Sequence, residues 1–122
     1  MGKVTAGQMI DRVDAMVPNV YSREEKLRWL REAERSVVDD VLRPLLGQAD
    51  AGEMTEDTEL LAQEGYEALY RYYLEAQIHY ANGELERYNN AMALWNNGLM
   101  TLRDHWCRGH MPRRQARALR LC

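Results

Sequence analysis

The sequence is poor in cysteine and lacks a long apolar run. Its two cysteines, Cys107 and Cys122, are too few for the disulfide framework of a small secreted domain, and they suit a reducing compartment. Nowhere do about 18 apolar residues follow one another, as a transmembrane helix requires. The first residues also lack the apolar stretch of a signal peptide. We therefore expect a cytosolic protein with no membrane partner.

Motifs of catalysis and cofactor binding are equally scarce. The sequence contains neither a Gly-rich phosphate loop nor a Gly-x-Ser-x-Gly nucleophile elbow. Residues that could bind a transition metal lie close together in the sequence only at His105, Cys107 and His110. A structural zinc site needs four ligands, so His79 or Cys122 would have to complete the set. We expect neither enzyme activity nor a cofactor, and the alternative is a metal-dependent enzyme that uses these three residues.

Charge is distributed unevenly along the chain. From residue 103 to residue 122 six arginines stand against one acid, about +5, whereas the preceding residues sum to about −8. An acidic body and a basic end favour head-to-tail contact between copies, or docking onto an acidic partner. The candidate partner-binding residues at the basic end are Arg113, Arg114, Arg117 and Arg120. The alternative is a solvated terminus.

Two helices are predicted in the first third of the chain. Each follows a capping box, in which Ser or Thr precedes Glu or Gln by three residues, and the two pairs are Thr5 with Gln8 and Ser22 with Glu25. Pro18 ends the first helix, because the residue before a proline is driven out of the helical region. Apolar residues recur at helical spacing through the second helix, which should run to about Leu42.

A helical hairpin is predicted over residues 66–81 and 84–106, with its turn at Asn82-Gly83. The apolar face of the first of these helices is too wide for packing on one side, so this helix is either central or also meets another chain. The second has apolar residues at heptad spacing. Beside that seam, Ala91 and Gly98 would allow another backbone to approach closely.

The segment between the two helical pairs, residues 47–63, has no periodicity and is rich in acids. It is either a solvated loop or a segment that contacts a neighbouring subunit, and Asp57 and Glu59 are its candidate partner-binding residues. The predicted fold class is all-α. It is a small four-helix domain over residues 1–110, followed by a basic tail over residues 111–122.

Five runs of residues resemble a known family. Glu67–Leu74, Ala81–Glu84 and Glu86–Asn96 look like small proteins from the head-morphogenesis modules of tailed bacteriophages and prophages. These are similar to the head-to-tail connector, or adaptor, proteins. Asp57–Leu61 and His110–Pro112 extend the resemblance, which covers about half of the chain.

The resemblance implies a non-catalytic, all-helical adaptor. Such a protein assembles in the host cytoplasm into a ring, commonly twelvefold, beneath the portal protein, and becomes part of the virion neck. It extends the channel through which DNA passes, without sequence-specific binding, toward a tail-side neck or stopper protein. The run from Arg113 to Arg120 is more basic than this family pattern. An alternative is therefore a small nucleic-acid-binding or DNA-packaging accessory protein that uses the Arg-rich tail.

Overall fold

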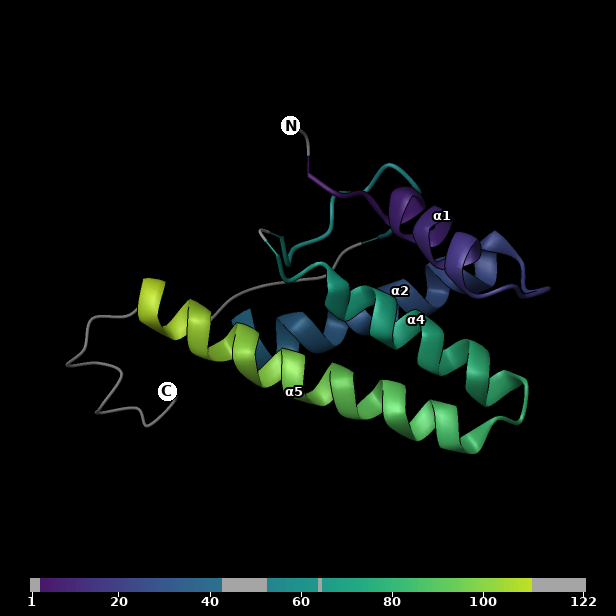
Figure 1. Ribbon diagram of the computed structural model, residues 1–122. Coiled ribbons are helices and arrows are strands. Elements are labelled where there is room, and N and C mark those ends of the chain that lie inside the picture. Colours follow the sequence, from purple (N-terminus) through teal and green to yellow (C-terminus); the bar gives the residue numbers. More distant parts are fainter. Residues whose placement is uncertain (1–2, 43–52, 64, 111–122) are drawn as a thin grey trace.

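Helices make up most of the chain in the computed structural model, which describes residues 3–42, 53–63 and 65–110 (Figure 1). They are α1 (Ala6–Met16), α2 (Arg23–Val37), the π-helical turn η1 (Val38–Leu42), α4 (Ala68–Ala81) and α5 (Leu85–His110). Within these described ranges the β-type pairing is limited to a single antiparallel bridge between Thr5 and Glu59. The predicted all-α class is confirmed.

The first two helices begin where their caps predict. Thr5 Oγ1 accepts from the Gln8 amide at 3.3 Å, and Gln8 Oε1 accepts from the Thr5 amide at 3.0 Å, which is a complete capping box. At α2 the Ser22 hydroxyl accepts from the Glu25 amide at 3.2 Å. The α1 helix ends two residues before Pro18. Local hydrogen bonding therefore sets both helix starts.

The predicted second helix is α-helical only as far as Val37. The turn that follows, η1, is π-helical and reaches Leu42, the predicted end. Val37 and Val38 are adjacent in sequence, yet each is only 1% exposed. The wider π turn changes the side-chain register at this point, so the apolar stripe stays on the core.

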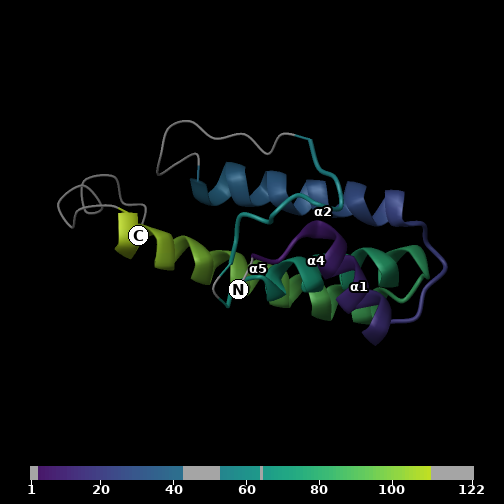
Figure 2. The same cartoon turned by 90° about the horizontal axis from the view of Figure 1, so that it is seen from above.

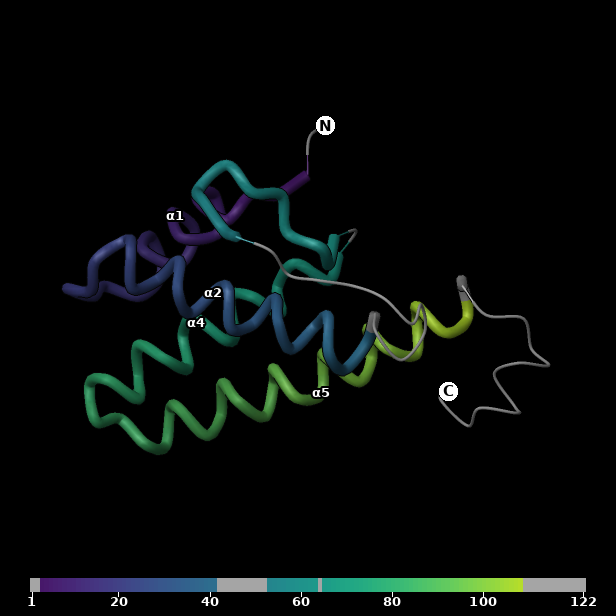
Figure 3. Tube along the Cα trace, turned by 180° about the vertical axis from the view of Figure 1, so that it is seen from behind, coloured from purple at the N-terminus to yellow at the C-terminus, as the bar shows by residue number. Residues whose placement is uncertain are grey.

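The α4 and α5 helices form the predicted antiparallel hairpin (Figures 1 and 3). In the turn, Gly83 has a positive φ of 79°, and its amide donates to the Tyr80 carbonyl at 3.0 Å. The backbone amide of Asn82 donates to the Ile78 carbonyl at 3.0 Å. These two bonds satisfy the carbonyls of Ile78 and Tyr80 in the last turn of α4. Compared with the sequence prediction, α4 starts two residues later and α5 continues four residues further.

The α4 helix is the central helix of the fold, because it packs on α1, α2 and α5. Its buried residues lie on several sides, which explains the width of the predicted apolar face; they are Leu69, Tyr70, Leu74, Ala76 and Ile78. A Cβ on Gly98 of α5 would lie only 2.4 Å from Leu69 Cδ2. The close approach predicted at Gly98 is therefore made within the same hairpin. None of the helices among the described residues is long and apolar enough to cross a membrane.

Candidate assembly interface

Residues 47–52 of the predicted acidic segment lie outside the described residues. The acidic segment, defined from here on as residues 53–61, is fixed against the N-terminus of the same chain (Figure 2). The Gly7 amide donates to the Glu56 carbonyl at 2.9 Å, and the Ala6 amide donates to the Thr58 carbonyl at 2.9 Å. The amide of Leu60 donates to the Val4 carbonyl at 3.0 Å. These backbone bonds hold the segment across the start of α1, with a turn at Glu56-Asp57, so it is not a freely solvated loop.

Side chains alternate along the end of this segment. Leu60 and Ala62 point into the core and are each 1% exposed. Asp57, Glu59 and Leu61 are exposed, Leu61 to 41%. From residue 59 to residue 62 this two-residue period is that of an extended strand, which places successive side chains on opposite sides, and Asp57 lies in the turn before it. The result is a ridge that displays two carboxylates and one leucine to solvent.

A buried carboxylate holds the C-terminal end of the acidic segment. Glu34, on α2, is 2% exposed and accepts from the Leu61 amide through Oε2 at 3.0 Å. Its Oε1 accepts from the Tyr70 hydroxyl of α4 at 2.5 Å, and that hydroxyl accepts from the Ala62 amide at 2.9 Å. Burial raises the pKa of Glu34, and the two hydrogen bonds to the carboxylate act in the opposite direction. One acid thus ties α2, α4 and the segment together.

Arg23 holds the acidic segment at Glu56, toward its N-terminal end. Its guanidinium lies 2.7 Å from Glu56 Oε1 and 3.0 Å from Asp11 Oδ1, so it joins α1, α2 and the acidic segment. The hydrogen bond from Arg23 lowers the pKa of Glu56. Because these groups are largely exposed, the ion pairs add little to stability. Their effect is to fix the position of the segment relative to the helices.

A second charged pair, Lys26 with Asp14, joins α1 to α2 next to Arg23. Lys26 is 3% exposed, and its Nζ lies 2.7 Å from Asp14 Oδ1. Burial acts to raise the pKa of Asp14, but hydrogen bonds from Lys26 and Asn19 outweigh it and lower the pKa. A buried ammonium without this partner would carry a large desolvation cost. The pair therefore supports the α1–α2 corner on which the segment rests.

The predicted partner-binding residues divide into two groups. Asp57 and Glu59 are both exposed, and their contact with a neighbouring subunit stays a prediction. The four arginines of the predicted tail lie outside the described residues; they are Arg113, Arg114, Arg117 and Arg120. Sequence analysis did not single out the supporting residues Glu34 and Lys26.

The alternative metal site is spread over the end of α5. The His105 ring packs on Tyr66 with a centroid separation of 4.9 Å. Cys107 is 1% exposed and is not a free thiol. Positions two apart on a helix point in different directions, which separates these two side chains. No group of three or more His, Cys, Asp or Glu side chains able to hold a metal ion is found in the part of the chain that the structure describes.

Comparisons with protein-family models, curated proteins and solved structures find no match to this chain. Its function is therefore inferred from its own residues and their arrangement.

Proposed function

We propose that this protein is the structural adaptor of a bacteriophage neck. Copies of the chain form a ring, with twelvefold symmetry as the expected number, beneath the portal protein. The ring extends the DNA channel and joins the head to a tail-side neck or stopper protein. It performs no catalysis, and DNA passes through it without sequence-specific binding. The protein is assembled in the host cytoplasm and ends in the virion.

The observation that carries the assembly part of this proposal is the rigid acidic ridge. Asp57 and Glu59 stand exposed on a segment that Arg23 and Glu34 fix from both ends. Carboxylates held in one position can recognise a partner without a large cost in ordering. A ring of copies related by rotation needs two different complementary faces on each subunit, and an acidic ridge supplies one.

Two further features support the neck. The runs Glu67–Leu74 and Glu86–Asn96, on which the resemblance to connector proteins rests, lie on the two helices of the hairpin. That hairpin is long and closely packed, as a rigid subunit of a ring requires. An acidic body also suits a DNA channel, because phosphates are repelled by acidic walls and held by basic ones.

Electron microscopy of the purified chain, alone and mixed with the portal oligomer encoded in the same genome, tests the proposal. We expect annular particles on the portal, with an open central channel. Alone, the chain can remain monomeric, so the portal mixture is the decisive sample. If the chain neither binds the portal nor changes the length of its channel, the neck proposal is wrong.

The second candidate, a nucleic-acid-binding accessory protein, is favoured by one observation. Six arginines stand against one acid from residue 103 to residue 122. Binding through such a tail would weaken steeply with salt, because phosphate contacts release counterions. Titration of duplex DNA at several salt concentrations, with and without residues 111–122, separates the candidates. The adaptor proposal expects no tail-dependent binding at physiological salt, and the accessory proposal expects strong binding that is lost on deletion.

A further inference from the structure

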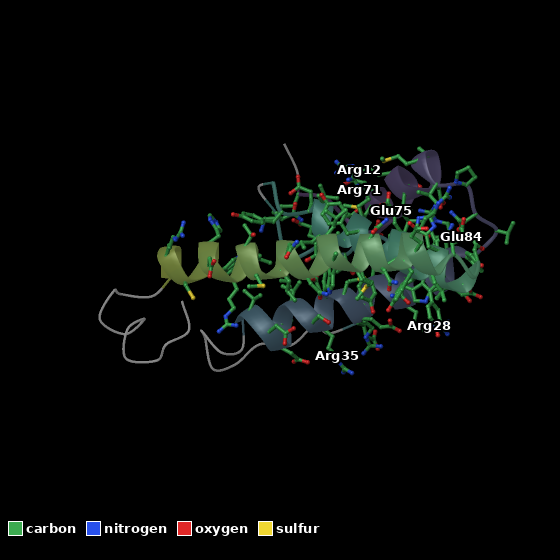
Figure 4. All side chains as sticks on the ribbon, turned by 60° about the horizontal axis from the view of Figure 1, so that its bottom comes forward. Arg12, Arg28, Arg35, Arg71, Glu75 and Glu84 are labelled. Carbon is green, nitrogen blue, oxygen red and sulfur yellow. The ribbon has the colours of Figure 1, made fainter. Side chains whose placement is uncertain are left out.

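A groove of about 450 Å³ runs between α1 and α4, away from the acidic segment. We call it the arginine groove; its lining residues are Met9, Arg12, Ala15, Met16, Gly65, Glu67, Ala68 and Arg71. The floor is apolar, and Met16 is 56% exposed beside it. Figure 4 shows Arg12 and Arg71 next to one another on this side of the molecule.

The guanidinium of Arg71 is poorly satisfied within the chain. Its Nε is buried and makes no hydrogen bond, and the nearest carboxylate oxygen, Oε1 of Glu75, lies 3.9 Å from it. Its Nη1 lies 4.0 Å from the sulfur of Met16, and Cζ lies over the Tyr72 ring, 5.1 Å from the ring centroid. A buried donor without an acceptor costs about 1–3 kcal/mol. An incoming carboxylate would meet the partly exposed Nη atoms of this guanidinium and not the buried Nε.

One acid, Glu67, also lines the groove. Glu67 Oε2 accepts from the amide of Gly65 at 2.9 Å, at the entrance to α4. Arg12, on the opposite wall, is exposed. The groove thus carries two guanidinium groups and one carboxylate, a net positive charge, above a floor that contains two methionines. It fits a segment that presents carboxylates together with an aliphatic side chain.

The acidic segment has this chemistry. We propose that the arginine groove of one copy binds the acidic segment of a second copy. Asp57 and Glu59 then meet the two guanidinium groups, and the exposed Leu61 packs on the methionines. Arg binds carboxylates through paired hydrogen bonds, which gives the contact direction as well as attraction.

The two surfaces cannot satisfy each other within one chain. Backbone hydrogen bonds with Val4, Ala6 and Gly7 hold the acidic segment in place, together with the side chains of Arg23 and Glu34. None of the exposed residues of its ridge lines the groove. Two complementary but separate surfaces on one rigid chain make a head-to-tail contact, which closes into a ring when the rotation per copy allows it. This inference rests on the proposed assembly and names its subunit contact.

Two variants, each altered at one surface, test the contact. Arg12→Glu reverses one of the two positive charges of the groove and leaves the acidic segment intact, whereas the double substitution Asp57→Ala with Glu59→Ala removes the carboxylates of the ridge and leaves the groove intact. All three positions are exposed, so the fold should persist, which circular dichroism checks. In sedimentation velocity at low salt we expect wild-type association that increases with concentration, and a loss of at least about tenfold in the association constant for each variant alone.

A mixture of the two variants gives the sharpest result. Each retains the surface that is altered in the other, so we expect a one-to-one complex that grows no further. Arg71→Gln, which keeps the bulk of the side chain, should weaken wild-type association in the same direction. Arg35→Glu is the matched control, because this exposed arginine lies on α2, outside the groove, and should leave association unchanged (Figure 4).

The contact is refuted if the two variants fail to pair, if Arg12→Glu associates as the wild type does, or if the wild type stays monomeric at every concentration. These outcomes do not decide the neck proposal. A chain that forms rings on the portal with Arg12→Glu and wild type alike would retain the proposed function and lose this subunit contact. A chain that pairs as described but does not bind the portal would retain this subunit contact and lose the proposed function.

Discussion

Removing the hydroxyl of Tyr70 should destabilise the fold far more than its single oxygen atom suggests. In Tyr70→Phe, Oε1 of Glu34 loses a donor at 2.5 Å and the amide of Ala62 loses an acceptor at 2.9 Å. Both sites are buried, and each unsatisfied group costs about 1–3 kcal/mol. We expect a loss of about 3 kcal/mol in the free energy of unfolding, a large part of the about 5–15 kcal/mol of a typical domain.

Tyr73→Phe provides the matched control on the same helix. The Tyr73 hydroxyl donates to Glu32 at 2.9 Å, but this hydrogen bond is exposed, so its loss should cost about 1 kcal/mol or less. Urea unfolding followed by circular dichroism measures both variants, and the midpoint should fall clearly further for Tyr70→Phe. If the two variants differ by less than about 0.5 kcal/mol, the buried network does not hold the segment as described.

Three further outcomes follow from individual contacts. Gly98→Ala should lower the free energy of unfolding by about 1 kcal/mol, because the new Cβ forces the buried Leu69 to move; in a Leu69→Ala background the same change should stabilise, and an equal effect in both backgrounds would contradict this. Burial raises the pKa of Glu34 in the folded state above its unfolded value of 4.5. The stabilisation that protonated Glu34 gives the fold is therefore fully present below pH 4.5 and is lost as the pH rises through the folded-state pKa. Relative to Glu34→Gln, the wild type should therefore gain stability as the pH falls from about 8 to about 5 in urea titrations, and a constant difference would count against it. Thr5→Ala should cost about 1 kcal/mol in thermal unfolding through loss of the α1 cap to Gln8, and no change would show the capping bond to be dispensable.

Local signals in the sequence predicted the helices well. Capping at Thr5 and Ser22, the helix-ending effect of Pro18 and the turn at Asn82-Gly83 each depend on residues within a few positions of one another. Such features need no knowledge of the partner elements. The π-helical turn after Val37 was not predicted, because an apolar run of this length fits either helical register.

Residues that join distant elements were the ones missed. Glu34 lies four residues after Leu30 and three before Val37, in the middle of the apolar stripe of α2. This spacing from apolar residues indicates a buried position. An acidic residue is nevertheless predicted to be exposed when the groups that would hydrogen-bond to it are unknown. Those partners, Tyr70 and Leu61, lie 36 and 27 residues away. Hydrogen bonds of such sequence separation cannot be read from periodicity.

The same long-range contacts bear on assembly, because they fix the two proposed subunit surfaces relative to one another. The acidic segment is attached to α1 through backbone bonds and to α2 and α4 through Glu34 and Tyr70. The arginine groove is formed by α1 and α4 themselves. Any rotation between successive copies is then set by one rigid body and not by a flexible connection. A constant rotation is the condition for a closed ring of defined size, so the buried network contributes to assembly without touching the interface.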